Sequence, residues 1–141
     1  MSVEADPLTP LASILSESLD RRSVRQPCGV GVCGACTAVV DGRAVRTCLR
    51  PAGLAQDATI VTAEGLADDD HVRRAFVEAG AAQCGFCIPG MVLAARTALE
   101  RAPDIDDAGI RHALAGNLCR CGTYARILDA VGAAAGRPDR G

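Results

Sequence analysis

Residues 28–36 have the sequence CGVGVCGAC, and the next cysteine is Cys48. These four cysteines follow the spacing C-x4-C-x2-C-x11-C. A second set follows the spacing C-x2-C-x31-C-x-C and consists of Cys84, Cys87, Cys119 and Cys121. All eight cysteines of the chain belong to one set or the other. The sequence therefore offers two complete sets of four thiolate ligands, which indicates two metal centres.

The opening C-x4-C-x2-C of the first set, with a fourth cysteine further along the chain, is the ligand spacing of a plant-type [2Fe–2S] cluster. Gly29, Gly31 and Gly34 lie between these ligands. Glycine permits positive φ and has no Cβ atom to block a close approach, so the loop can wrap around a small cluster. Its backbone N–H groups then turn toward the cluster sulfurs, where hydrogen bonds set the reduction potential. We expect the first cysteine set to bind one cluster, with these three glycines against it.

The second set consists of two close pairs, and each pair precedes a predicted helix. Cys84 and Cys87 come before a helix that starts near Pro89, and Cys119 and Cys121 come before a helix over residues 123–135. Both pairs therefore meet the positive end of a helix dipole, which stabilises an anionic cluster. Antiparallel pairing of the helices brings the two pairs together. We expect these four cysteines to bind a second cluster.

The periodicity of apolar residues changes near residue 64. Before that point it predicts a short amphipathic helix over residues 10–20, a hairpin of residues 37–40 and 43–47 around Asp41-Gly42, and a short strand over 59–62. After it, helices are predicted over 68–80 and 89–101, then over a segment capped by Asp104, then over 123–135. The expected fold class is α+β. A β-rich domain spans residues 1–63 and a four-helix domain spans residues 64–141, with a frayed C-terminal tail.

The composition excludes several classes of protein. Aromatic residues make up 2% of the 141 residues, so two small domains would be thinly packed and would depend on metal clusters for stability. A net charge of −2 gives no reason to expect nucleic acid as a partner. No segment has the roughly 20 apolar residues of a membrane span, and no signal peptide is visible. We expect a cytoplasmic protein, because reduced thiols suit metal ligation and argue against disulfides.

Tetrahedral zinc is the main alternative metal, because C-x2-C pairs also build zinc ribbons. The x4 spacing of the first set and the C-x-C of the second fit a zinc ribbon poorly. A Rieske centre needs two histidine ligands, whereas His71 and His112 each lie in a predicted helix away from the cysteines. No nucleophile–base pair or phosphate-binding loop is visible, so we expect no catalytic centre in this chain alone.

Four motifs carry a resemblance to a known family. They are CGVGVCGAC at 28–36, TAEGL at 62–66, QCGFCIPGM at 83–91 and GNLCRC at 116–121. With these motifs in this order, the chain from about Pro7 to Val131 resembles the small [2Fe–2S] subunit of the molybdenum hydroxylases. That family includes xanthine dehydrogenase, carbon monoxide dehydrogenase and aldehyde oxidoreductases.

The resemblance implies a β-grasp ferredoxin-like domain and a four-helix domain, each with one [2Fe–2S] cluster. It implies a large partner subunit that binds molybdenum through a molybdopterin dinucleotide, and usually a partner subunit that binds FAD. Electrons would pass from molybdenum to the helical-domain cluster, then to the ferredoxin-like cluster, then to flavin. Gln83 and Cys121 would lie on the pterin side, with Gly85 also at the cofactor, and the loop from Cys28 to Cys36 would face flavin.

The chain departs from the family pattern in three places. Only residues 1–6 precede Pro7, so we expect that the first strand of the β-grasp domain is missing, with one sheet edge exposed or covered by a partner, unless the start codon is misplaced. Pro27 replaces a common glycine beside the first ligand. Gly122-Thr123 inverts the usual Thr-Gly order.

Two functions other than a hydroxylase subunit remain open at the level of sequence. The first is a free-standing two-cluster ferredoxin-type electron carrier, which would not associate with a molybdenum protein. The second is a zinc-stabilised interaction module, which would be colourless.

Overall fold

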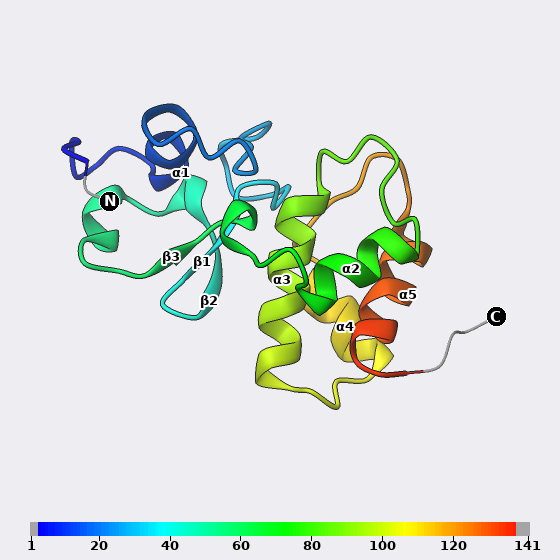
Figure 1. The fold of residues 1–141 in the computed structure, drawn as a ribbon. Helices are drawn as coiled ribbons and strands as arrows, with labels where there is room; N and C mark the ends of the chain where they lie inside the picture. The colour runs from blue at the N-terminus through cyan, green and yellow to red at the C-terminus, as the bar shows by residue number, and fades with distance from the viewer. Residues whose placement is uncertain (1–2, 138–141) are drawn as a thin grey trace.

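A computed structural model describes residues 3–137, in which a small sheet lies beside a group of helices (Figure 1). This arrangement confirms the predicted α+β class. The part with the sheet, residues 3–61, is called the sheet region below, and the part with α2 to α5, residues 71–134, the helical region. The division into domains at residue 63 stays a prediction, and the tail beyond residue 137 lies outside the described residues.

The sheet region begins with a short helix and contains three antiparallel strands. Its helical elements are α1 (Leu11–Ser13), the π-helical turn η1 (Ile14–Ser18), and the 3₁₀ turns η2 (Thr47–Leu49) and η3 (Ala52–Ala55). Its strands are β1 (Thr37–Val40), β2 (Arg43–Arg46) and β3 (Ile60–Val61), in the order β2-β1-β3. The predicted hairpin is confirmed: Asp41 and Gly42 have φ of 48° and 72°, as a type I′ turn requires.

The helical region contains the four predicted helices, after the 3₁₀ turn η4 (Ala63–Gly65). They are α2 (His71–Glu78), α3 (Ile88–Arg101), α4 (Asp107–Leu114) and α5 (Tyr124–Ala134). One predicted cap is wrong. Asp106, not Asp104, caps α4, because its extended backbone immediately precedes the first helical residue and its carboxylate accepts the Gly109 N–H at 2.7 Å.

Strand β1 is buried on both faces and separates two apolar cores. Successive side chains of a strand point to opposite faces, so Ala38 and Val40 pack in a small core with Leu11 and Leu15 of the first helical turns. Val39 points the other way and packs in the larger core built by α2, α3, α4 and α5. Helix α3 therefore lies directly against the sheet, and this contact fixes the distance between the two regions.

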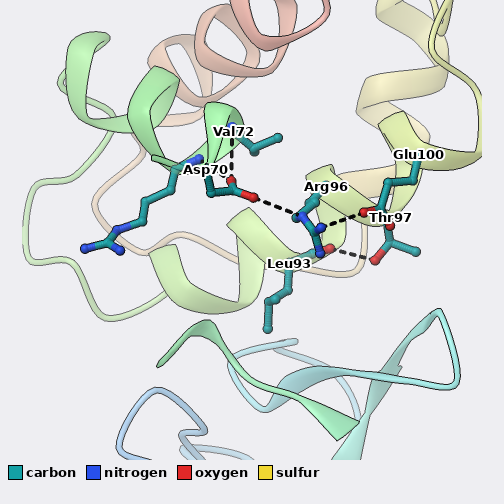
Figure 2. A network of polar contacts seen from close by, with 7 residues as sticks. Asp70, Val72, Leu93, Arg96, Thr97 and Glu100 are labelled. Carbon is teal, nitrogen blue, oxygen red and sulfur yellow. Dashed lines mark hydrogen bonds and ion pairs between the residues drawn. The ribbon is translucent and has the colours of Figure 1, made fainter. Parts of the chain in front are cut away.

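A polar network joins α2 to α3 (Figure 2). The side chain of Asp70 accepts the N–H groups of Val72 and Arg73 and so caps α2. Its other oxygen lies 3.0 Å from Nε of Arg96 in α3, and the Arg96 guanidinium also pairs with Glu100. The Asp70 side chain is only 8% exposed, so this ion pair is mostly shielded from water. The network orients α3, which Cys87 immediately precedes as the N-cap residue.

The outer edge of β3 pairs with no strand among residues 3–137. Residues 3–10 add only an isolated bridge between Pro10 and Pro51, so within residues 3–36 no strand precedes β1. Apolar side chains of the first helical turns and of Ile60 line a groove beside this edge. No helix among the described residues is long and apolar enough to cross a membrane.

Candidate iron–sulfur centres

The first cysteine set lies in the loop that leads from η1 to β1 and in the turn after β2. Its thiols form two contacting pairs, Cys28 with Cys33 and Cys36 with Cys48. Cys36 and Cys48 are buried, while Cys28 and Cys33 are partly exposed. The hairpin brings Cys48 back toward Cys36. Thr37 pairs with Arg46, Cys36 directly precedes Thr37, and η2 with Cys48 directly follows Arg46. The two pairs also lie within electrostatic range of each other, so four thiols converge on one place.

Backbone N–H groups point at these sulfurs, as the glycine content predicts. The N–H groups of Cys33, Val30 and Val32 hydrogen-bond to the thiol of Cys28 and lower its pKa to about 6. Burial raises the pKa of Cys48 to about 11, although the N–H of Gly31 also points at it. Gly29, Gly31 and Gly34 all have positive φ, between 66° and 76°. A bound metal ion would deprotonate Cys48 outright, and the N–H groups would then stabilise the anionic cluster.

The second cysteine set lies where two loops run side by side before α3 and α5 (Figure 1). Its thiols also form two contacting pairs, Cys84 with Cys121 and Cys87 with Cys119. Cys87 and Cys119 are each 9% exposed, whereas Cys84 and Cys121 are exposed. The second set therefore has a buried side next to the protein interior and an open side on the surface.

Thr123 and Tyr124 at the start of α5 hold Cys119 in place. The Thr123 hydroxyl lies 3.4 Å from Sγ of Cys119, and the Tyr124 hydroxyl accepts the Cys119 N–H at 2.7 Å. Burial acts to raise the pKa of Cys119, but the hydrogen bonds from Thr123 outweigh it and lower that pKa to about 7. Burial raises the pKa of Cys87 to about 12. The inverted Gly122-Thr123 order thus places a hydroxyl against the sulfur of Cys119, a predicted ligand.

The paired arrangement of the thiols fits a binuclear cluster. No group of three or more His, Cys, Asp or Glu side chains within residues 3–137 is placed to hold a single metal ion. A [2Fe–2S] cluster needs two thiolates on each of two iron atoms, and each set supplies two separate thiol pairs. The donor chemistry and the pairing both fit [2Fe–2S] clusters.

Hydrogen bonds from Leu118, Asn117 and Arg25 connect the loops of the two cysteine sets. The N–H of Leu118 donates to the carbonyl of Cys33 at 2.9 Å. The side chain of Asn117 donates to the carbonyl of Gly34 at 3.0 Å. The Nη1 of Arg25 donates to the carbonyls of Gly85 and Phe86 in the second set's loop, at 2.9 and 2.6 Å. Cys33 of the first set and Cys119 of the second are thereby connected through one hydrogen bond and the backbone of Leu118.

Sequence reasoning missed Asn117 and Arg25 as functional residues. Asn117 is buried between two cysteine-bearing loops, and a buried amide needs partners; its position beside Gly116 in a cysteine motif was the available signal. Arg25 gave no signal, since arginine is abundant in this chain. Gln83 is exposed beside Cys84, and Gly85 has φ of 75°. His71 and His112 lie in α2 and α4, as predicted.

Known proteins share this sequence and fold. A model of the [2Fe–2S] binding domain family matches residues 62–132. The small FeS subunit of nicotinate dehydrogenase from Eubacterium barkeri is 44% identical over 133 residues, which cover 92% of this chain and 85% of that protein. The iron–sulfur-binding subunit of xanthine dehydrogenase from Escherichia coli O157:H7 is 45% identical over 134 residues, which cover 92% and 84%. The chain belongs to the small iron–sulfur subunits of the molybdenum hydroxylases.

Solved structures of this family agree with the fold of this iron–sulfur subunit. Quinoline 2-oxidoreductase from Pseudomonas putida 86 contains a chain with a TM-score of 0.87 and 36% identity, covering 94% of this chain and 85% of that one. The aldehyde oxidoreductase from Desulfovibrio gigas matches with a TM-score of 0.90 and 33% identity, covering 96% of this chain and 16% of that one. The family model spans the second cysteine set and begins after the first, so its match bears on the helical region.

Proposed function

We propose that this iron–sulfur subunit transfers electrons within a molybdenum hydroxylase complex. It would relay them from a molybdopterin centre in a large partner subunit, through two [2Fe–2S] clusters, to FAD or another acceptor on a further partner. The two four-thiolate sets, joined by the hydrogen bond from Leu118 to Cys33, carry the proposal. The clusters supply one-electron chemistry, and the chain supplies their ligands and fixes their separation.

The exposure of the thiols supports an order of transfer. The pair Cys84 and Cys121 is on the surface, where a partner's cofactor can approach the second cluster. The pair Cys87 and Cys119 is buried, and Cys119 follows Leu118, which contacts Cys33 of the first set. Electrons would therefore enter at the exposed pair and pass toward the first set. Gln83 and Gly85, next to the exposed pair, would contact the incoming cofactor.

Exposed apolar side chains around both sets support a subunit over a free carrier. Val30, Val32 and Leu49 border the first set and are each at least 60% exposed. Phe86 and Leu118 border the second set and are 45% and 48% exposed. Such side chains favour burial against another protein. We place the molybdopterin subunit against the second set and the flavin subunit against the first, in the cytoplasm, where thiols stay reduced.

Metal analysis of the complex purified from native extract tests the function. About four iron atoms per chain, two for each [2Fe–2S] cluster, are expected together with about one molybdenum. Iron without molybdenum would favour the free carrier. Zinc in place of iron would overturn the proposal.

Two variants test the order of transfer. Cys121→Ser is expected to remove the second cluster and stop turnover while molybdenum stays bound in the complex. Cys36→Ser is expected to stop reduction of the final acceptor while substrate still reduces molybdenum. Rapid flavin reduction in the Cys36→Ser complex would contradict the proposed order.

A further inference from the structure

Asn117 is a buried polar side chain that belongs to the helical region but bonds to the sheet region. It is 7% exposed and lies two residues before Cys119 of the second set. Its Nδ2 donates to the carbonyl of Gly34 at 3.0 Å and to Oγ1 of Thr37 at 3.2 Å. Both acceptors lie in the sheet region, and Gly34 lies between Cys33 and Cys36 of the first set. The amide of Asn117 thus acts across the boundary between the regions.

The carbonyl of Gly34 belongs to the same peptide unit as the N–H of Ala35. That N–H hydrogen-bonds to the sulfur of Cys33. A hydrogen bond accepted at one end of a peptide unit polarises the unit and strengthens the bond donated at the other end. The side chain of Asn117 therefore acts on the sulfur of Cys33 through one peptide unit.

The packing around Gly34 keeps this contact in one geometry. A Cβ atom at Gly34 would lie 2.4 Å from the carbonyl oxygen of Gly116 and 2.8 Å from the Asn117 side chain. A Cβ atom at Gly90, in the first turn of α3, would lie 2.6 Å from the carbonyl oxygen of Gly34. Two glycines therefore allow the regions to approach closely. The N–H of Leu118 bonds the neighbouring carbonyl of Cys33, so consecutive carbonyls are both held.

We infer that Asn117 is a positioning residue that raises the reduction potential of the first cluster by hydrogen bonding to the Gly34 carbonyl from the helical region. This inference rests on the proposed function, because it requires a cluster on the first set. Hydrogen bonds to the sulfurs stabilise the reduced, more negative cluster. In the transfer step one electron leaves the second cluster, which is oxidised, and reduces the first cluster. Asn117 makes that step more favourable.

The variant Asn117→Leu, made in the full chain within its native complex, tests the inference. Leucine has a similar size and lacks the donors, while the Gly34 carbonyl keeps its bonds from the N–H and hydroxyl of Thr37 at 3.1 and 2.7 Å. A redox titration followed by electron paramagnetic resonance reports each cluster separately. The potential of the first cluster is expected to fall, lowering the equilibrium constant for its reduction by the second cluster about two- to fivefold, where tenfold equals about 59 mV. The potential of the second cluster is expected to stay unchanged.

Arg101→Ala is the matched control, because Arg101 also bonds across the regions, to the carbonyl of Gly42 at 3.2 Å, at the hairpin turn away from the cysteines. It is expected to leave both potentials unchanged. If Asn117→Leu fails to bind the first cluster, the same redox titration is made on Thr37→Val. That variant removes the hydroxyl that donates to the same Gly34 carbonyl. A drop in thermal stability with no change in potential, or an equal change in both clusters, would overturn the inference. Absence of two [2Fe–2S] signals in the unmutated complex would overturn the proposed function instead.

Discussion

The guanidinium of Arg25 lies over the ring of Phe86, 4.8 Å from the ring centroid. Its Nη1 also donates to the carbonyls of Gly85 and Phe86, at 2.9 and 2.6 Å. Arg25 lies three residues before Cys28 of the first set, and Phe86 lies between Cys84 and Cys87 of the second. A residue of the sheet region thus holds the loop that would bind the cluster of the helical region.

Arg25→Ala is expected to loosen the loop of Cys84 and Cys87. Loss of the ring contact and of two charge-assisted hydrogen bonds should lower the free energy of unfolding by about 1–3 kcal/mol. The second cluster should then release iron to a chelator faster, which its electron paramagnetic resonance signal measures. Arg22→Ala is the control, because Arg22 forms an exposed pair with Asp20 in its own loop. Equal rates of iron release from the second cluster in the two variants would contradict this prediction.

Gly34→Ala is expected to destabilise the protein more than Gly29→Ala. Both glycines have positive φ, of 71° and 66°. A Cβ atom at Gly34 would collide with the Gly116 carbonyl oxygen at 2.4 Å, whereas one at Gly29 would meet no atom within 4 Å. We expect a loss of about 1–2 kcal/mol for Gly29→Ala from the backbone alone, and about 2–5 kcal/mol for Gly34→Ala. Urea unfolding of the two variants compares their free energies of unfolding. Equal losses would show that Gly34 and the Gly116 carbonyl are not in close contact.

Asp70→Ala is expected to weaken the polar network between α2 and α3 that Figure 2 shows. The change removes the cap of α2 and the shielded partner of Arg96, at a cost of about 1–3 kcal/mol in the free energy of unfolding. Asp68→Ala removes an ion pair with Arg73 in which the Asp68 side chain is fully exposed, and should leave the free energy of unfolding nearly unchanged. Urea unfolding measures both, and similar losses would argue against the role of the network.

The free energy of unfolding is expected to fall in acid as the carboxylate of Glu64 becomes protonated. Burial acts to raise its pKa, but hydrogen bonds from the hydroxyl and N–H of Ser23 outweigh it and lower the pKa to about 2 from the ordinary 4.5. Because the pKa is lowered in the folded state, the stabilisation is complete above the ordinary value and is lost as pH falls from there toward 2. After solvent screening, the stabilisation by the Glu64 carboxylate amounts to about 1 kcal/mol.

The variant Ser23→Ala isolates the contribution of Glu64. Acid affects the clusters of both proteins alike, so the difference in unfolding midpoint between the variant and the unmutated protein reports the Ser23 hydroxyl. That difference should be present near neutral pH and shrink as the pH falls toward the lowered pKa of Glu64. A difference that is independent of pH would disprove the assignment.

Removal of iron by a chelator is expected to unfold the sheet region before the helical region. Among residues 3–137, the core of the sheet region has eight buried residues, including the predicted ligands Cys36 and Cys48, whereas the larger core, built by the helices with Val39 of β1, has twenty. The smaller core depends more on its metal. Hydrogen exchange should show loss of protection in β1 and β2 while α3 and α5 remain protected. Simultaneous loss in both regions would show that the two cores unfold as one unit.

Local features of the fold could be predicted because short-range rules govern them. Asp41-Gly42 specifies a type I′ turn by backbone preference alone, and the apolar periodicity places α2 to α5 within a few residues of their ends. The cap of α4 was assigned to Asp104 and belongs to Asp106, because three acidic residues stand within four positions there and periodicity does not fix the helix start to one residue.

The sequence by itself determined the donor chemistry of this protein: eight cysteines, their division into two sets, and the glycines that let a loop wrap around a cluster. Tertiary structure alone decided how the sets are connected. Asn117 and Gly34 are 83 residues apart, and Arg25 and Gly85 are 60 apart. Such pairs meet only because α3 packs against β1 and sets the separation of the two regions. No local preference encodes that distance, since it depends on which side chains fill the core between helix and sheet.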